Sequence, residues 1–222
     1  MHDAFCPLRH WLEEETMERK KFIKEYLEPI VIAVLIALFI RTFIIQAFKI
    51  PSSSMEPTLL VGDHILVSKF IYGIKIPFTD TRLFQLNKPK RGDVVVFIFP
   101  KDPSKDFIKR VIGVGGEKVE IIRNKIYIND KLIDDPWGYF SERSDWTRYL
   151  QPMERYGPKI IPKDSLFVLG DNRDNSQDSR FWDFVNVNAV KGKAIIIYFS
   201  WNGSTENLLN KIRWGRFGKL IH

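Results

Sequence analysis

The sequence predicts a mainly β, antiparallel domain preceded by one N-terminal transmembrane helix. One apolar run, residues 27–48, is long enough to cross a bilayer, and no later apolar run exceeds about eight residues. Downstream of it, short runs of β-branched and aromatic residues alternate with turn residues and not with helical segments. Strands in series without intervening helices are typical of antiparallel sheets.

Residues 27–48 are almost continuously apolar, with Arg41 and Gln46 inside the run. About 20 helical residues cover the ~30 Å hydrocarbon core of a bilayer. The alternatives are a buried helix of a soluble protein and a cleaved signal peptide. A helix apolar on all sides over this length fits neither, and no small-x-small cleavage site follows it. We therefore expect a single membrane anchor.

The charges beside the anchor predict its orientation. The preceding tail, residues 1–26, is polar and carries a basic cluster close to the apolar run. Basic residues favour the cytoplasmic side of a membrane. We expect a cytoplasmic N-terminus and an exported domain over residues 49–222. The cluster comprises Arg19, Lys20, Lys21 and Lys24.

Seven segments of the exported part have strand patterns. Two of them form a predicted hairpin about Arg123-Asn124. Residues 134–163 are aromatic, charged and broken by prolines, and we expect them to be an insertion or cap. The strand segments are residues 64–72, 93–99, 107–114, 118–122, 125–128, 165–169 and 194–201.

Composition excludes several function classes. The 222 residues carry a net charge of +7, but no helix-turn-helix, zinc-finger or RNA-binding aromatic motif accompanies the basic charge, so nucleic acid is not an expected partner. The single cysteine, Cys6, excludes an intramolecular disulfide and metal sites built on paired cysteines. We expect no metal and no other cofactor.

Residues 51–63 hold a candidate nucleophile, Ser54. Three serines lie between Pro51 and Pro57, which favours extended or turning backbone. Ser54 follows the end of the predicted anchor by a few residues, so a reactive hydroxyl there would act on a substrate in, or emerging from, the bilayer. The alternative is a polar turn without chemistry.

A serine nucleophile needs a base, and histidine is the usual one. His2 and His10 fall on the other side of the membrane in the predicted topology, and His222 is the last residue. His64, on a predicted strand, remains a candidate base.

Lysine serves as a base when it is neutral, because burial disfavours the ammonium form. Lys109 lies in a run that is apolar from Phe107 to Val114 apart from Arg110. Strand alternation puts Lys109 and Arg110 on opposite faces, so Lys109 can face the interior while Arg110 stays in solvent. The alternative is a solvated strand lysine.

Residues 170–180, Gly-Asp-Asn-Arg-Asp-Asn-Ser-Gln-Asp-Ser-Arg, follow a predicted buried strand. The EF-hand calcium template fails here, because Arg173, Ser176 and Trp182 occupy its third, sixth and twelfth positions. A loop of Asp–Arg pairs that orients a neighbouring catalytic group is the more economical hypothesis.

Four segments together resemble, in order, the sequence boxes of bacterial type I signal peptidases. The resemblance runs from the anchor to about Trp201, without residues 134–163. It implies a partly open, barrel-like catalytic domain of antiparallel sheets. The segments begin at Phe48 (Phe-Lys-Ile-Pro-Ser-Ser-Ser-Met-Glu-Pro-Thr-Leu), Arg91 (Arg-Gly-Asp-Val-Val-Val-Phe), Phe107 (Phe-Ile-Lys-Arg-Val-Ile-Gly) and Gly170 (the eleven-residue stretch above).

The resemblance implies that Ser54 is the nucleophile and Lys109 the general base. It gives Ser52 a role in the oxyanion hole, beside the Ser54 backbone N–H. It also implies that Ser176 hydrogen-bonds the Lys109 amine. It further implies that Asp171, Asp178 and Arg180 brace the loop.

The chain departs from the family pattern in two places. Ser53 stands where the family commonly has glycine, and residues 113–117 are Gly-Val-Gly-Gly-Glu where Gly-x-Pro-Gly-Asp is common. The second change falls in a turn.

The expected activity is cleavage of signal peptides from exported preproteins with small residues at positions −1 and −3. The substrate would bind as an added strand. Met55 and Ile108 are weaker candidates for pocket walls. The expected location is the bacterial inner or plasma membrane, with the catalytic domain on the exported side. A basic tail with Arg213, Arg216 and Lys219 would rest on lipid or on solvent.

Two alternatives remain at this point. One is a self-cleaving repressor-type protease with the same Ser/Lys logic, against which the anchor and the lack of a DNA-binding domain count. The other is a membrane-tethered β-domain that binds partners without catalysis.

Overall fold

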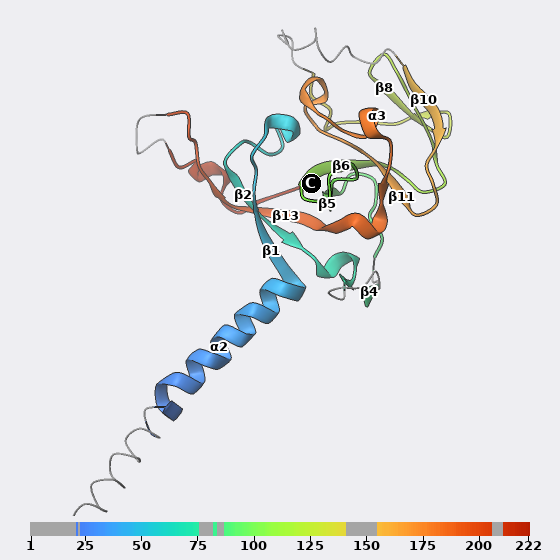
Figure 1. The fold of residues 1–222 in the computed structure, drawn as a ribbon. Coiled ribbons are helices and arrows are strands. Elements are labelled where there is room, and N and C mark those ends of the chain that lie inside the picture. Colours follow the sequence, from blue (N-terminus) through green and yellow to red (C-terminus); the bar gives the residue numbers. More distant parts are fainter. Residues whose placement is uncertain (1–20, 22, 76–81, 84–86, 141–154, 206–210) are drawn as a thin grey trace, which may run out of the picture. The chain divides into compact units, whose positions relative to one another are not determined.

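The computed structural model describes residues 21, 23–75, 82–83, 87–140, 155–205 and 211–222. The chain divides into two compact units, Met1–Phe43 and Ile44–His222 (Figure 1). The described part of the first unit is helical, and the second unit is built mainly from strands. Most of the predicted tail, residues 1–26, lies outside the described residues.

The helical unit contains α2 (Glu28–Phe39), flanked by the π-helical turns η1 (Ile23–Leu27) and η2 (Ile40–Ile44). Lys24–Ile44 is a candidate span of 21 residues with a mean hydropathy of 2.3, and none of its most apolar stretch is buried. At 1.5 Å per residue this span is roughly 32 Å long, about the thickness of the bilayer hydrocarbon. The expected apolar helix is therefore present.

The predicted end of the helix, at residue 48, is wrong. The helical run stops at Ile44, and Ile45–Lys49 form strand β1. Its residues pair antiparallel with β2 (Asp63–Ser68), from Ile45 opposite Ser68 to Lys49 opposite His64. Hydrophobicity alone did not separate these residues from the anchor, because a helix and a half-buried strand both accept Ile, Ala and Phe.

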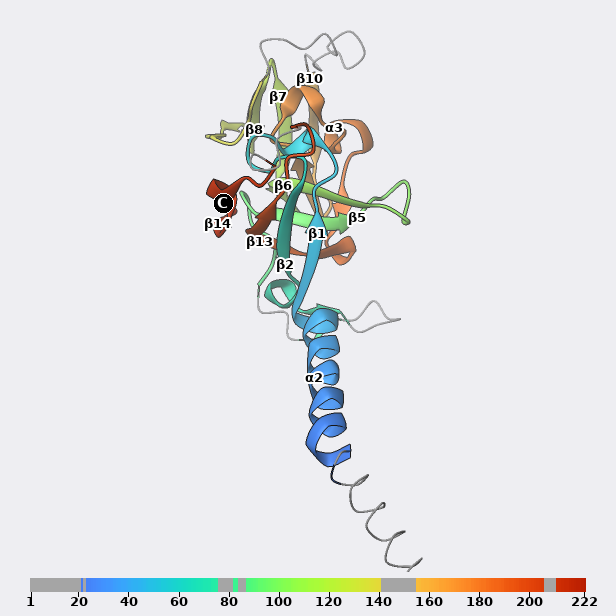
Figure 2. The same ribbon diagram turned by 90° about the vertical axis from the view of Figure 1, so that its left-hand side faces the viewer.

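The main sheet has eight strands, all antiparallel to their neighbours, in the order β1-β2-β13-β5-β6-β11-β12, with β14 also on β13. Strands β1 and β12 end this path and do not pair with each other, so the sheet is open. In Figure 2, β5 and β6 run across the direction of β1 and β2. The other bounds are β5 (Val94–Ile98), β6 (Asp106–Val114), β11 (Ser165–Leu169), β12 (Val185–Asn186), β13 (Val190–Ser200) and β14 (Lys219–Leu220). The predicted mainly β, partly open architecture is confirmed.

A smaller antiparallel sheet has the order β10-β7-β8-β9. Its central hairpin is confirmed, because Arg123 and Asn124 both adopt the positive φ angles, 46° and 67°, that a tight hairpin turn requires. The strands are β7 (Lys118–Ile122), β8 (Lys125–Ile128), β9 (Lys131–Leu132) and β10 (Arg155–Ile160), and a separate pair joins β3 (Ile74–Lys75) to β4 (Arg82–Leu83).

Residues 134–163 were predicted to be an insertion or cap. The C-terminal part of this segment instead belongs to the smaller sheet. Strand β10 lies inside it and pairs with β7, from Arg155 opposite Ile122 to Ile160 opposite Lys118. The strand escaped prediction because Gly157 and Pro158 break its pattern. Residues 141–154 of the insertion lie outside the described residues.

The remaining helices are single turns. The predicted strand 64–72 is shorter than expected, because it ends at Ser68 and a 3₁₀ turn, η4 (Phe70–Tyr72), follows. The only described α-helix of the β-rich unit is α3 (Ser179–Trp182). The other 3₁₀ turns are η3 (Ser53–Met55), η6 (Arg173–Asn175), η7 (Val187–Ala189) and η9 (Trp214–Arg216).

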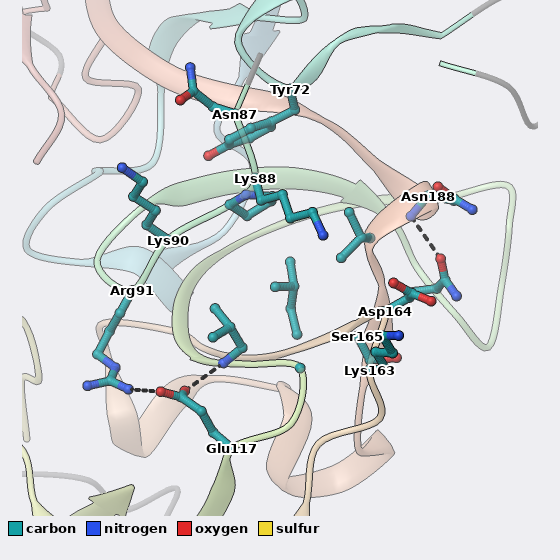
Figure 3. A pocket seen from close by; sticks show the side chains of 16 residues that line it. Tyr72, Asn87, Lys88, Lys90, Arg91, Glu117, Lys163, Asp164, Ser165 and Asn188 are labelled. Carbon is teal, nitrogen blue, oxygen red and sulfur yellow. Dashed lines mark hydrogen bonds and ion pairs between the residues drawn. The ribbon is translucent and has the colours of Figure 1, made fainter. Parts of the chain in front are cut away.

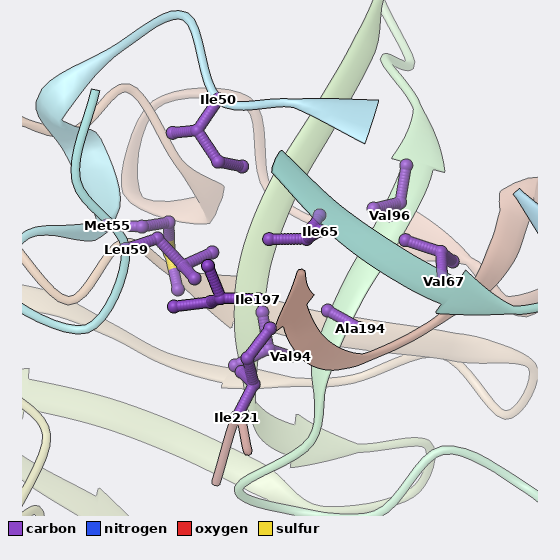
Figure 4. Packing of buried hydrophobic residues seen from close by; sticks show 10 residues of the cluster. All are labelled: Ile50, Met55, Leu59, Ile65, Val67, Val94, Val96, Ala194, Ile197 and Ile221. Atoms are coloured by element: carbon purple, nitrogen blue, oxygen red, sulfur yellow. The ribbon is translucent and has the colours of Figure 1, made fainter. Parts of the chain in front are cut away.

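A buried apolar cluster anchors the Ser54 turn to the main sheet (Figure 4). Met55 and Leu59, on the turn, are fully buried against strand residues such as Ile65 and Ile197. Each such side chain removed from water contributes about 1.5–3 kcal/mol. The complete cluster is Ile50, Met55, Leu59, Ile65, Val67, Val94, Val96, Ala194, Ile197 and Ile221.

The C-terminal segment is part of this core and not a free basic tail. Ile221 N–H donates to Ile195 O, and the Ile221 side chain lies in the apolar cluster. Arg216 forms an ion pair with the fully buried Asp63 carboxylate, at 2.6 Å. Asp63 also accepts from the Ser200 hydroxyl, at 2.6 Å. Arg216, which the sequence left on lipid or in solvent, is thus held by an internal carboxylate.

Replacing Arg216 by methionine is expected to lower the free energy of unfolding by about 3 kcal/mol, because it leaves the buried Asp63 carboxylate without its counter-ion. The measurement is thermal and urea unfolding of the full chain in detergent. Lys219→Met, at an exposed position of β14, is the matched control and should change stability by less than about 0.5 kcal/mol. Equal stability of the two variants would contradict this account of Arg216.

Candidate active site

The Ser54 hydroxyl lies in a turn that the core holds in place. Ser54 is the middle residue of η3, and the next residue, Met55, is fully buried. Leu59 N–H donates to Met55 O at 2.9 Å, which closes the turn after the serine. The Ser54 residue is only 8% exposed, so its hydroxyl is largely screened from water.

The amine of Lys109, on strand β6, lies next to this hydroxyl. Its Nζ lies 2.6 Å from Ser54 Oγ, within hydrogen-bond distance, although the residues are far apart in the sequence. Lys109 is 4% exposed, and its Nζ lies 5.5 Å from the centre of the Phe107 ring. The structure thus brings together the predicted nucleophile and the predicted base, and the lysine is not a solvated strand residue.

Burial lowers the pKa of the Lys109 ammonium from its ordinary value to about 8. Asp178 and Asp171 act in the opposite direction, because negative charge favours the ammonium, and Arg180 adds to the lowering. With a pKa of about 8, roughly a tenth of the lysine is neutral at pH 7. A neutral amine can accept the hydroxyl proton of Ser54.

Three hydrogen bonds join the loop at residues 170–180 to the serine turn. Asn172 N–H donates to Ser54 O at 3.1 Å, and the Asn172 side-chain amide donates to Ser53 O at 3.2 Å. Asn175 Nδ2 donates to the Ser53 hydroxyl at 2.8 Å. Ser53, whose side chain departs from the family pattern, is therefore used to fasten the nucleophile turn.

Arg110 is buried, contrary to the prediction that it stays in solvent. Arg110 and Asp171 are both fully buried and form a two-pronged ion pair, with Nε–Oδ1 at 2.8 Å and Nη2–Oδ2 at 2.7 Å. The Thr58 hydroxyl donates to Asp171 Oδ2 at 2.6 Å. The prediction failed because alternation separates the two faces of a strand but does not show which faces are covered.

The Nη1 group of the Arg110 guanidinium also has hydrogen-bond acceptors. Nη1 donates to Gly92 O at 2.7 Å and to His222 O at 2.8 Å, and the guanidinium lies 4.7 Å from the centre of the Trp137 ring. These hydrogen bonds hold the buried guanidinium in one position. Arg110 thus joins β6, the serine turn and the C-terminal segment.

Asp178 and Arg180 form a hydrogen-bonded pair within the loop. Asp178 accepts from Arg180 Nε at 2.9 Å and from the Gly170 N–H at 3.1 Å. Arg180 Nη2 donates to Arg173 O at 2.6 Å. These bonds fix both ends of the loop behind Lys109.

The predicted hydrogen bond from Ser176 to Lys109 is not present. Ser176 Oγ is buried and has no hydrogen-bond partner among the described residues. It faces Gly170, where an added Cβ would lie 2.2 Å from Ser176 Oγ and 2.4 Å from Ser54 O. The site therefore needs glycine at position 170. The Lys109 amine is directed to Ser54 instead.

Three other sequence candidates have different surroundings. Ser52 is exposed at the start of η3, and its side chain makes no capping hydrogen bond. His64 packs on the rings of Tyr198 and Phe199 and makes no hydrogen bond to Ser54 within the described part of the chain. Met55 belongs to the core, so it does not form an accessible pocket wall.

The beginning of the predicted insertion touches the site loop. Tyr139 N–H donates to Asp171 O, and Arg173 N–H donates to Tyr139 O, each in a main-chain bond of about normal length. The Asp135 carboxylate forms a partly buried ion pair with Arg173. Residues 135–139 therefore support the loop and are not remote from it.

Sequence reasoning missed Arg110, Thr58, Asn172 and Asn175 as site residues. Thr58 and the two asparagines lie inside the segments that resemble the family boxes, so their positions could have marked them as site residues. Their hydrogen-bond partners, however, follow only from the fold. Within the described ranges, no group of three or more His, Cys, Asp or Glu residues lies together as metal ligands would.

The sequence was compared with known proteins. The family model for signal peptidase, peptidase S26, matches residues 23–201. A signal peptidase I from Pseudomonas aeruginosa is 36% identical over 231 residues, covering 90% of this chain and 81% of the relative. One from Aquifex aeolicus is 36% identical over 233 residues, covering 82% and 84%.

A solved signal peptidase I from Enterococcus faecalis V583 shares 30% identity and covers 48% of this chain and 97% of its own, with a TM-score of 0.38, too low to bear on the fold. The family model and the two curated relatives cover most of the sequence, including the Ser54, Lys109 and 170–180 segments. The chain belongs to the signal peptidase family, peptidase S26.

Proposed function

We propose that this protein is a membrane-anchored serine endopeptidase that removes signal peptides from exported preproteins, with Ser54 as nucleophile and Lys109 as general base. The observation that carries the proposal is the buried Lys109 Nζ at 2.6 Å from Ser54 Oγ. A hydroxyl within hydrogen-bond reach of an amine that burial makes easier to deprotonate is the minimal arrangement for serine catalysis without histidine.

In the first step, neutral Lys109 takes the Ser54 hydroxyl proton while Oγ attacks the scissile carbonyl carbon. The new C–O bond gives a tetrahedral intermediate whose oxyanion would accept hydrogen bonds from the Ser54 N–H and the Ser52 hydroxyl. Ser52 is exposed at the start of the turn.

Collapse of the intermediate breaks the peptide C–N bond, and the Lys109 ammonium gives its proton to the leaving amine. The product is the mature protein with a free amino terminus, and the signal peptide remains as an ester on Ser54. Lys109, neutral again, then takes a proton from water as the water attacks the ester carbonyl. The second collapse frees the signal peptide and returns the proton to Ser54.

The substrate assignment rests on the family membership and on the anchor. The named relatives are signal peptidases, and Lys24–Ile44 is long and apolar enough to span a bilayer. The basic residues of the preceding tail favour a cytoplasmic N-terminus, which puts the β-rich unit on the exported side of the bacterial plasma membrane. Small residues at −1 and −3 and binding as an added strand are part of this proposal.

Ser54→Ala and Lys109→Met are each expected to reduce cleavage by roughly 10⁴-fold or more, because each removes a group that takes part in bond making. The measurement is cleavage of a preprotein with an Ala-x-Ala site by the full chain in detergent. Lys109→Met should also keep or raise the melting temperature, since methionine carries no charge that burial disfavours.

Lys125→Met, at the exposed first residue of β8, is the control and should cleave at the wild-type rate. Full cleavage by Lys109→Met would place the base elsewhere, with His64 as the next candidate. No cleavage by the wild type under varied lipid and pH would favour the tethered-binder alternative.

The pH dependence of cleavage follows from the lowered pKa of Lys109, about 8. The base is neutral above this pKa and protonated below it, so kcat/KM should rise with pH. The neutral fraction increases about tenfold between pH 7 and pH 9, and kcat/KM should follow. A profile that is flat over this range would contradict a lysine base.

The Ser53 hydroxyl and Asn175 form one hydrogen bond that holds the nucleophile turn. Asn175→Ala and Ser53→Ala are each expected to lower kcat by roughly 2- to 10-fold, the equivalent of one hydrogen bond of about 0.5–1.5 kcal/mol. The double variant should lose no more than either single variant. Additive losses in kcat would show that the two side chains act separately.

A further inference from the structure

A cavity of about 620 Å³ lies at the far end of the β6–β11 strand pair from the dyad (Figure 3). Its lining includes Val114, at the end of β6, and Leu166, which is the register partner of Val114 in β11. At about 3.3 Å per residue, Val114 is roughly 17 Å along β6 from Lys109. No residue of the dyad or of the 170–180 loop lines the cavity, so it is separate from the candidate active site.

The cavity wall has more positive than negative charge. Four cationic side chains line it, Lys88, Lys90, Arg91 and Lys163, against two carboxylates, Glu117 and Asp164. Glu117 is already engaged, because it accepts from Arg91 Nη2 at 2.6 Å and from the Val114 N–H at 2.9 Å. The charges of Arg91 and Glu117 cancel, which leaves three lysines and one carboxylate, Asp164, in the lining.

Among the described residues, these three lysines have no carboxylate partner. In the described part of the chain, Lys88, Lys90 and Lys163 form no ion pair, whereas five other lysines of the β-rich unit each pair with an aspartate. Unbalanced ammonium groups around a concavity attract anions and raise their local concentration. The paired lysines are Lys105, Lys118, Lys159, Lys191 and Lys193.

The lining also fits an uncharged part of a ligand. In Figure 3, the Lys88 side chain extends toward the middle of the cavity, whereas Lys90 is directed outward. Asn87 and Asn186 add side-chain amides to the lining, and Val114 and Leu166 add apolar side chains. The volume is in the range that holds a small organic molecule. A compact anionic head with a small neutral body matches these surroundings.

We propose that this cavity is a second binding site, separate from the peptidase site, for a ligand that carries a phosphate group. Lysine binds phosphate as a point charge, and phosphate can take several ammonium and amide donors at once, whereas one carboxylate offers fewer acceptor positions. Lys88 and Lys163 contribute the positive charge, and the apolar lining residues Val114 and Leu166 contact the uncharged part of the ligand. The same chemistry describes a soluble phosphate ester and a phosphatidylglycerol headgroup.

The test is calorimetric titration of the full chain in an uncharged detergent. Two probes separate the sources: glycerol 1-phosphate, and short-chain dihexanoyl-phosphatidylglycerol below its micellar concentration, with the phosphatidylcholine analogue as reference. Saturable binding of either anionic probe is expected. Binding of glycerol 1-phosphate alone assigns a soluble ester, and binding of phosphatidylglycerol, but not of phosphatidylcholine, assigns the headgroup.

Lys88→Gln and Lys163→Gln are each expected to weaken probe binding about tenfold or more, the loss of one charge-assisted hydrogen bond. Lys131→Gln, an exposed lysine of β9 outside the cavity, should leave the affinity unchanged. All three variants should cleave preprotein at the wild-type rate, because none of these residues belongs to the dyad or its loop. Absence of binding by both probes, or binding that none of the cavity variants weakens, would overturn the proposal.

Discussion

The ion pair between Arg110 and Asp171 is the interaction on which the site depends. Both side chains are fully buried, and removal of either would leave a charge in the protein interior without compensation. Because Arg110 lies on β6 and Asp171 begins the loop after β11, the pair fixes the loop to the strand. Asp171 also accepts from Thr58, four residues after Ser54, so the same pair reaches the nucleophile turn. The relative position of Ser54 and Lys109 follows from this shared attachment.

Two adjacent cations of β6 therefore have opposite surroundings. Arg110 has a carboxylate, two main-chain carbonyls and an aromatic face as partners, so its charge is compensated inside the protein. Lys109, on the other face of the strand, has the neutral Ser54 hydroxyl as its hydrogen-bond partner. Burial without a counter-ion disfavours the ammonium form, whereas arginine stays protonated under these conditions. One strand thus supplies a permanent structural cation and a base that can be neutral.

The sequence was sufficient for the elements whose pattern is local. The hairpin 118–128, the strand 165–169 and the apolar helix depend on neighbouring residues, and the structure has them as predicted. The strands β1 and β10 were missed, because β1 continues an apolar run and β10 contains Gly157 and Pro158. Their extended form depends on pairing with β2 and β7, which no local pattern encodes. The site contacts of Arg110 and of the Ser53 hydroxyl were missed for the same reason, since their partners are distant in sequence.

The aspartates near Lys109 present an apparent difficulty for a neutral lysine. Asp178 and Asp171 raise the pKa of the Lys109 ammonium, yet burial outweighs them and the pKa stays at about 8. Each carboxylate also has its own arginine, Arg110 for Asp171 and Arg180 for Asp178, and Arg180 adds to the lowering of the Lys109 pKa. An ion pair acts on a third charge mainly as a dipole, whose effect falls off faster with distance than that of a lone carboxylate. The Asp–Arg pairs can therefore brace the loop beside the amine while its pKa stays below the ordinary value of lysine, and replacing Arg180 by a neutral residue should raise the pKa of the Lys109 ammonium as well as loosen the loop.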